Sequence, residues 1–298
     1  MKRLFLSSII MLIAIAVSAQ VKVAPKLAKG QKMSYTTVST ANMGMAIKAT
    51  TDVTYEVTDE TADGFVITAT TTKFETEGGE EMVRSMMTLT EQALLNQPLE
   101  LTTTREGKVT GIRNLAAAQK SISDLAMKLV EELYAKNPAL AQAMPKEAMV
   151  EQVNSAADEQ ALLKSIALTP TSPLVLNGLT VQNMGQDTYV NSQNINMKRM
   201  YFVTNAGKTI TTSSTANMTE AEVKDYIIQQ AEKQAPDQAE MIKQNIDAMM
   251  ASGMMKINAS EKAKYDLGEN GWVSAIEASS TMSVMGQNIT MEAKVTLK

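Results

Sequence analysis

The residues of this chain that could carry out chemistry are acidic pairs and methionine pairs, because its 298 residues include no histidine and no cysteine. Without these two residue types, Ser-His-Asp and Cys-His nucleophilic sites, histidine acid–base chemistry and the usual zinc and copper(II) ligand sets are excluded. The lack of cysteine also means that the fold is stabilised by its core without disulfides.

Acidic pairs occur at Asp59-Glu60, Glu80-Glu81 and Glu131-Glu132. Two carboxylates that face each other across a cleft can hydrolyse a glycosidic bond. The first two pairs fall in expected loops and the third on an expected helix surface, so solvated charge is the favoured interpretation. The chain also lacks the GxGxxG, full GxxxxGK[ST], GxSxG and calcium-loop patterns. We therefore assign no catalytic residue, cofactor or metal site, and expect a protein that is not an enzyme.

Methionine is abundant, with 23 residues in the chain. Its flexible thioether side chain fills irregular apolar space and adapts to varied surfaces. A methionine-rich core is the favoured explanation, an adaptable apolar groove is the second, and Cu(I) held by thioethers is the third. The candidate thioether pairs are Met43-x-Met45, Met86-Met87, Met249-Met250 and Met254-Met255. For Trp272 a core or rim anchor is favoured over a platform on which a ligand stacks. If a groove exists, we expect its lining to include Met43, Met45, Trp272, Met285 and Met291.

The N-terminus has the pattern of a secretory signal peptide. Lys2 and Arg3 precede an apolar run over residues 4–17, and Val17-Ser18-Ala19 supplies the small residues of a cleavage site. The apolar run, about 14 residues, is shorter than the roughly 20 that a membrane-spanning helix needs. We expect cleavage after Ala19, a mature chain that begins at Gln20, and a periplasmic or otherwise extracytoplasmic location. No cysteine is present for lipid attachment.

Charge limits the choice of partner. The full chain has a formal net charge of −4, and removal of residues 1–19 takes away two basic side chains. A mildly acidic chain without a basic block is not expected to bind nucleic acid. A lipid or an envelope protein is the expected partner, with no membrane span after signal removal, and the oligomeric state stays open.

The C-terminal residues 265–298 give the clearest secondary-structure signal. They predict three strands separated by turns at Gly271 and Met285-Gly286, with apolar and polar residues alternating from Ile289 to Lys298. Weaker alternation runs through residues 33–74 and 174–214. Helical stripes occur at 122–133, 148–166 and 223–249. Thr219-Glu220-Ala221-Glu222, just before the last stripe, has the pattern of a capping box at a helix start. The pattern predicts an α+β fold: curved antiparallel sheets with helical segments packed on one face.

Two segments of the chain resemble each other. Tyr55-Glu56-Val57-Thr58 and Tyr201-Phe202-Val203-Thr204 each precede a turn and a Gly-x-x-Ile-Thr strand. The best linker between them is Thr169–Pro173, with two prolines. We expect the signal peptide at 1–19, one sheet-plus-helix half at 20–168 and a second, pseudo-repeated half at 174–298. Two similar units and one extended sheet built from both halves remain open alternatives.

Short motifs carry a resemblance to known proteins. The signal peptide ends in Val-Ser-Ala-Gln, and the mature chain has a Lys29–Tyr35 lead-in, an Arg105–Val109 hairpin and a closing hairpin from Tyr265 to Trp272. With these motifs the chain resembles exported Bacteroides-type envelope proteins of unknown function. Its strand-then-helix halves are also similar in plan to the half-barrel of periplasmic lipoprotein carriers, where a sheet wraps helices over an apolar cavity. Neither resemblance supplies catalytic residues.

Two functions fit these expectations. The first is a non-enzymatic exported protein that binds a lipid, lipopeptide or other apolar ligand in a methionine-rich groove. The alternative is a structural or interaction protein of the cell envelope with a dry core. A carboxylate-based hydrolase is the least favoured. An inner apolar cavity of a few hundred Å3 is what distinguishes the first from the second.

Overall fold

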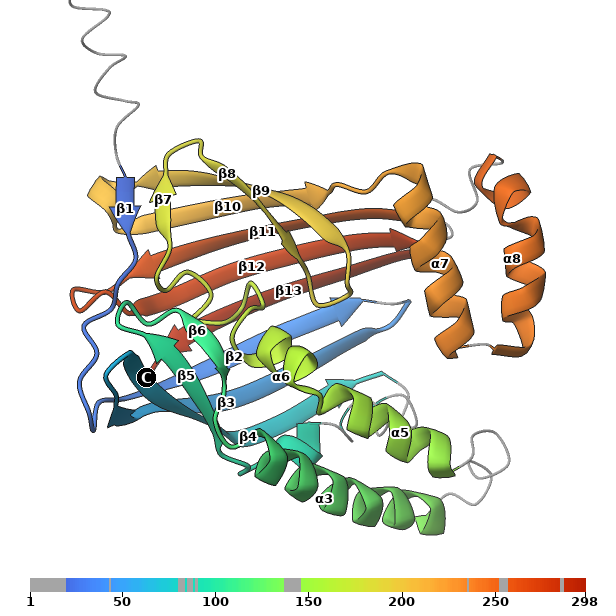
Figure 1. Ribbon diagram of the computed structural model, residues 1–298, viewed down its shortest axis with the longest axis horizontal. Coiled ribbons are helices and arrows are strands. Elements are labelled where there is room, and N and C mark those ends of the chain that lie inside the picture. The colour runs from blue at the N-terminus through green and yellow to red at the C-terminus, as the bar shows by residue number, and fades with distance from the viewer. Residues whose placement is uncertain are drawn as a thin grey trace, which may run out of the picture.

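The computed structural model describes residues 20–42, 44–79, 84, 88, 91–136, 146–234, 236–251, 257–284 and 287–298, and the account below concerns these. They form an α+β fold in which a large curved antiparallel sheet carries helices on one face, as the alternation and the helical stripes predict (Figure 1). Many strand positions hold threonine, valine or isoleucine, whose branched side chains favour the extended backbone.

Within these ranges the main sheet has 11 strands, in the order β6-β5-β4-β3-β2-β13-β12-β11-β10-β9-β8. The strands from the first half of the chain are β2 (Lys32–Asn42), β3 (Ala46–Glu60), β4 (Gly64–Gly78), β5 (Leu99–Thr104) and β6 (Val109–Ile112). Those from the second half are β8 (Gln186–Val190), β9 (Asn196–Thr204), β10 (Thr209–Ala216), β11 (Ile257–Leu267), β12 (Val273–Val284) and β13 (Gln287–Leu297). Short strands β1 (Gln20–Lys22) and β7 (Thr180–Gln182) pair with each other.

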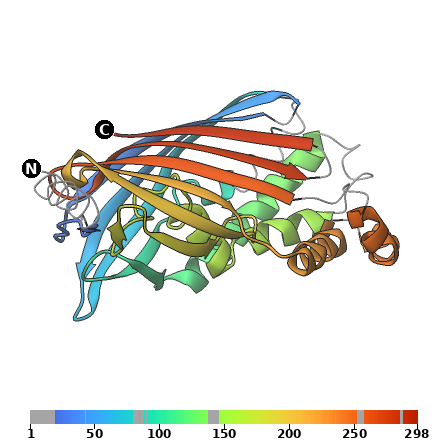
Figure 2. The ribbon, with the colours of Figure 1, turned by 90° about the horizontal axis from the view of Figure 1, so that it is seen from above.

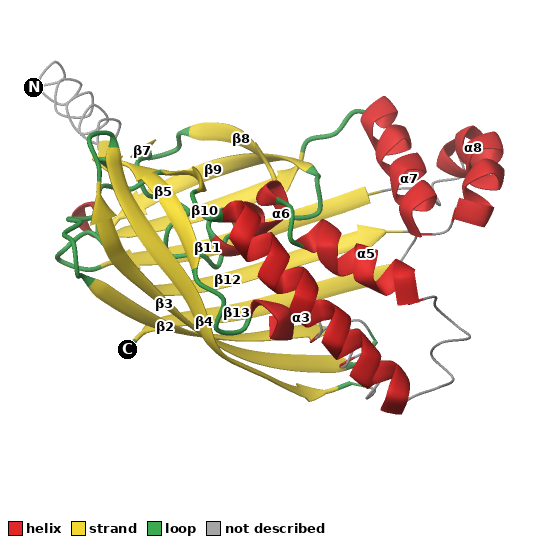
Figure 3. Ribbon diagram, turned by 60° about the horizontal axis from the view of Figure 1, so that its bottom comes forward, coloured by secondary structure: helices red, strands yellow, loops and turns green. Residues whose placement is uncertain are grey.

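Helices pack on the concave side of the sheet and at one of its ends (Figures 2 and 3). α3 (Leu115–Lys136), α5 (Lys146–Ala156) and α6 (Glu159–Ile166) lie against the concave face. α7 (Glu220–Gln234) and α8 (Pro236–Ala251) lie at the end of β9–β12. α7 begins with the predicted capping box: the Thr219 amide donates to Glu222 Oε2 at 2.7 Å, and the Glu222 amide donates to Thr219 Oγ1 at 3.3 Å.

The predicted alternation decides which side chains face the helices. In β11, Ile257, Ala259, Ala263 and Tyr265 are buried, while the intervening lysines are exposed. The turn before β12 contains Gly271 at a φ of 79°, where a Cβ atom would also lie 3.1 Å from the backbone of Ala24 and Pro25. A glycine fits this turn because it tolerates positive φ and close approach.

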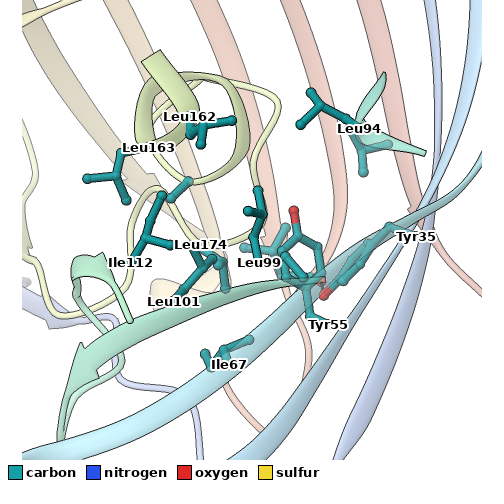
Figure 4. Packing of buried hydrophobic residues seen from close by; sticks show 14 of the residues in the cluster. Tyr35, Tyr55, Ile67, Leu94, Leu99, Leu101, Ile112, Leu162, Leu163 and Leu174 are labelled. Carbon is teal, nitrogen blue, oxygen red and sulfur yellow. Dashed lines mark hydrogen bonds between the residues drawn. The ribbon is translucent and has the colours of Figure 1, made fainter. Parts of the chain in front are cut away.

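One hydrophobic cluster joins the two halves of the chain. It combines Leu101, Ile122 and Val130 from residues 20–168 with Trp272 and Val295 from residues 174–298. Part of its first-half side is visible in Figure 4, where Tyr35 and Tyr55 lie beside Leu99 and below α6. Strand β13 pairs directly with β2, from Thr290 opposite Asn42 to Leu297 opposite Tyr35. The described residues therefore show one continuous sheet shared by both halves.

Residues 169–173 are not an exposed linker, contrary to the expectation from their sequence. Ser172 is only 2% exposed, and Pro173 and Leu174 are also buried. The segment crosses the concave side of the sheet between α6 and β7, where it packs within the core. Proline restricts the backbone in the same way whether a segment is buried or exposed. The two prolines of this segment therefore did not show whether it lies in the core or on the surface.

Candidate functional site

The candidate site lies on the concave face of the sheet, where residues 169–172 cross it; we call these residues the strap. A cavity of about 150 Å3 lies on one side of the strap and a cavity of about 200 Å3 on the other. We call them the first and second cavity, and together the inner groove. Strap residues Thr169 and Thr171 line both cavities.

The first cavity has a floor of small and apolar side chains and a polar end. Inward-facing residues of β12 and β13 form the floor, because alternation places them on the helix-facing side of the sheet. Pro170 of the strap lies over it, and Gln193 and Glu261 supply the polar end. The floor residues are Ala278, Ser280, Met291 and Ala293.

The second cavity lies over β2–β5. Val53, Tyr55 and Leu99 contribute apolar surface, while Glu91 supplies a carboxyl group. Burial raises the pKa of Glu91 above its ordinary value.

Two tyrosines fix the position of the strap and the residues before it. The hydroxyl of Tyr265 donates to the Pro170 carbonyl oxygen at 2.9 Å, and that of Tyr55 donates to the Ile166 carbonyl oxygen at 3.5 Å. The Tyr55 ring packs edge-on against the Tyr35 ring at a centroid distance of 5.9 Å. Burial raises the pKa of Tyr55 and Tyr265 far above neutral pH, so both hydroxyls stay protonated and act as donors.

A polar cluster of β8 and β9 flanks the first cavity. Arg199 lies over the rings of Tyr189 and Tyr201, with its guanidinium carbon 4.6 and 5.0 Å from their centroids. It also forms a two-point ion pair with Asp187, with N–O distances of 3.0 and 2.7 Å. Burial raises the pKa of Asp187, but hydrogen bonds from Arg199 and Tyr201 outweigh this effect, and the pKa lies below its ordinary value.

Glu261 connects this cluster to the first cavity. It is 8% exposed and accepts hydrogen bonds from the Tyr189 hydroxyl at 2.6 Å and the Asn191 side-chain nitrogen at 3.0 Å. Asn191 is held in turn, since its Oδ1 accepts from the amides of Gln193 and Ile195 at 3.0 and 2.9 Å. A carboxylate fixed by these neutral donors therefore lines the end of an apolar cavity.

Comparisons with known proteins include a distant structural likeness. No protein-family model matches the chain, and no curated protein matches it. A solved structure described as "Lipid-protein interactions in lipovitellin" superposes with a TM-score of 0.42 and 8% sequence identity. The match covers 90% of this chain and 25% of that one, so the chain spans about a quarter of the length of its structural neighbour.

The described residues among those predicted to line a groove lie in different parts of the structure. Met291 lines the first cavity and is 42% exposed. Trp272 is 1% exposed in the main core, so it is an anchor of that core and not part of the groove lining. Met45 is 48% exposed in the β2–β3 connection and lines neither cavity. Met43, Met285 and the cleavage-site residue Ala19 lie outside the described residues, whereas Gln20 begins β1.

The acidic pairs that are described form ion pairs near the surface. Asp59 pairs with Arg113 at 3.0 Å, Glu60 with Arg105 at 2.7 Å, and Glu131 with Lys146 at 2.7 Å. Glu80-Glu81, Met86-Met87 and Met254-Met255 lie outside the described residues. Over the ranges that are described, no group of three or more acidic side chains is placed to hold a metal ion. No helix in those ranges is both long and apolar enough to cross a membrane.

Sequence reasoning missed Glu261, although a signal for it exists. Ile257, Ala259, Ala263 and Tyr265 alternate inward along β11, and Glu261 occupies the same register. A charged residue at an inward position is rare unless it is paired or functional. Its partners Tyr189 and Asn191 lie some 70 residues away in the chain, so no local spacing points to the cluster.

Replacing Glu91 with glutamine is expected to stabilise the protein at neutral pH. Its raised pKa means that the folded state favours the protonated carboxyl group. The stabilisation of the folded state by the protonated Glu91 carboxyl group is fully present below the unfolded-state pKa of about 4.3. It is lost as pH rises through the folded-state pKa. Thermal unfolding from acidic to neutral pH should show E91Q melting above the wild type at neutral pH, with the difference disappearing in acid.

The exposed Glu131 provides a control of opposite sign. A hydrogen bond from Lys146 lowers the pKa of Glu131, so E131Q should be neutral to slightly destabilising at neutral pH. If E91Q melts at or below the wild-type temperature at neutral pH, the burial of the Glu91 carboxyl group has been misassigned.

Proposed function

We propose that this protein binds a single alkyl chain or another small apolar ligand in the inner groove and does not act as an enzyme. The observation that carries the proposal is the first cavity, whose floor of small residues ends at the partly exposed Met291. Leu168, next to the strap, is 46% exposed. Covering apolar surface contributes roughly 25 cal/mol per Å2, so a ligand that packs on these side chains gains binding energy.

Cavity size limits the ligand. A cavity of about 150 Å3 lined by apolar side chains holds a molecule the size of benzene, and the two cavities here are of about 150 and 200 Å3. This favours one alkyl segment of a lipid or lipopeptide over a ligand with two bulky chains. The strap lines both cavities, so a chain that spans both would pass along Thr169 and Thr171.

The location is part of the proposal. The charged start, apolar run and small residues of positions 1–19 support export and cleavage after Ala19. We infer that the mature protein binds its ligand outside the cytoplasm. Mass determination of the protein purified from cells tests this directly, because cleavage after Ala19 predicts a chain that starts at Gln20.

Replacing Met291 with glutamine should weaken the binding of an apolar probe about fivefold. Met291 is partly exposed, so its contact with a ligand is worth about 1 kcal/mol, less than the value for a fully buried methionine. The measurement is a fluorescence titration of the chain purified from its host envelope with a neutral naphthylamine dye, after extraction of bound lipid and mass analysis of the extract.

The same substitution at Met184 is the matched control. Met184 is 66% exposed and lines neither cavity, so M184Q should bind the dye as the wild type does. If the extract holds no lipid and the wild type takes up no dye, the groove is not a binding site and the structural, dry-core alternative replaces it. If the two variants lose affinity equally, the dye binds elsewhere.

A further inference from the structure

The carboxyl groups that line the inner groove have no cation beside them in its lining. Among the described residues that line the cavities, the carboxyl groups are Glu261 in the first and Glu91 in the second, Tyr55 in the second stays protonated, and neither lining includes a lysine or an arginine. A bound carboxylate or phosphate would thus meet a carboxyl group and no cation in either cavity. Like charges at short range disfavour the ionised pair.

The charge of Glu261 is not cancelled within its own cluster. Its two hydrogen-bond donors, the Tyr189 hydroxyl and the Asn191 amide, are neutral. The nearby cation, Arg199, forms its ion pair with both carboxylate oxygens of Asp187. The three formal charges of Asp187, Arg199 and Glu261 therefore leave a net charge of −1 beside the first cavity.

Glu261 also retains hydrogen-bonding capacity. A carboxylate offers about four lone-pair positions, and the two hydrogen bonds from Tyr189 and Asn191 use one position on each oxygen. The side chain is 8% exposed and lines the cavity, so a ligand in the cavity is what can approach the remaining positions. A protonated amine matches them, because it brings both positive charge and donors.

We propose that the first cavity selects single-chain amphiphiles with a protonated amine, with the amine against Glu261 and the alkyl chain against Met291 and Ala293. This rests on the proposed function, and it names the head group that the same site takes. Fatty-acid carboxylates are the ligands it discriminates against. The Glu261–Tyr189–Asn191 hydrogen bonds fix the carboxylate before binding, which reduces the ordering cost when the ligand arrives.

The test compares probes that share a tail and differ in head group. Octylamine, octanol and octanoate are titrated against the dye-loaded chain at neutral pH and physiological salt. We expect octylamine to displace the dye at about one tenth of the octanoate concentration, with octanol between them. The E261Q variant should lose most of this preference while it keeps its affinity for octanol.

The control for overall charge is E292Q. Glu292 is exposed on β13, pairs across the sheet with Ser279, and loses the same formal charge on substitution. E292Q should keep the preference of the wild type for octylamine. An equal loss in E261Q and E292Q would assign the preference to net charge and overturn the proposal.

The remaining outcomes separate this inference from the proposed function. If all three probes displace the dye equally from the wild type, the apolar groove stands and the head-group assignment is wrong. If none displaces it and no dye binds, the proposed function has failed as well. Should E261Q not fold, the ranking of the three probes on the wild type decides the question without it.

Discussion

Deletion of residues 272–298 is expected to abolish the cooperative unfolding transition of the whole chain, including the half at residues 20–168. The deleted segment contains β12 and β13, which lie between β11 and β2 in the middle of the sheet. Without them β2 loses its pairing with β13, and β11 loses its pairing with β12. The two remaining groups of strands would each present a new, long edge to solvent.

The lost packing exceeds the stability of a typical domain. The deletion removes Trp272, Val273, Ile276 and Val295, each 1% exposed or less. Truncation of one large buried side chain costs about 2–5 kcal/mol, whereas domains are stable by about 5–15 kcal/mol in total. Removal of four such residues together with the central strands therefore leaves no stable native state.

Far-ultraviolet circular dichroism and calorimetry of the truncated chain measure this effect. Deletion of Lys298 alone is the control, since it removes an ion pair with Asp52 at 2.7 Å and one backbone hydrogen bond to Ser34 at the sheet end. Exposed ion pairs contribute about 0–1 kcal/mol, so this shorter chain should melt close to the wild type. A cooperative transition that survives the long deletion would show that the first half folds independently.

Local patterns allowed the elements of the sheet to be predicted, but not their neighbours. Alternation along residues 289–298 gave the buried face of β13 correctly, because strand side chains point to opposite faces in turn. The Thr219–Glu222 capping box placed the start of α7, because its hydrogen bonds are local. The pairing of β13 with β2 joins residues near opposite ends of the chain, and no local pattern encodes such a partner.

Only part of the candidate site could be predicted from the sequence, again because local patterns do not show which distant segments meet. Met291 could be named because a large apolar residue in the inward register of a half-covered strand faces a groove or a core. The strap could not, because Thr169–Ser172 has the composition of a surface turn. Its burial depends on hydroxyl donors of Tyr55 and Tyr265, which lie far away in the sequence.

Replacing Trp272 with alanine is expected to destabilise the protein by about 3–5 kcal/mol, the largest effect we predict for a single substitution. Trp272 is among the largest fully buried side chains and packs in the cluster that joins both halves. Its backbone is fixed by the Gly268 amide, which donates to its carbonyl oxygen at 2.7 Å, and by the Asn270 side chain, which accepts from its amide at 3.1 Å. Because the surrounding turn is held in place, the structure cannot collapse fully into the space.

Replacing Trp272 with phenylalanine separates the effect of lost side-chain volume from the effect of the indole N–H group. In the structure as described, the Trp272 indole nitrogen is buried without a hydrogen-bond partner, which carries a desolvation cost of about 1–3 kcal/mol. W272F removes that cost while it keeps one aromatic ring, so it should destabilise by about 1–2 kcal/mol, clearly less than W272A. Urea unfolding of both variants gives the comparison. Equal destabilisation would mean that the indole nitrogen does have a partner, and that the polar contact outweighs the packing at this position.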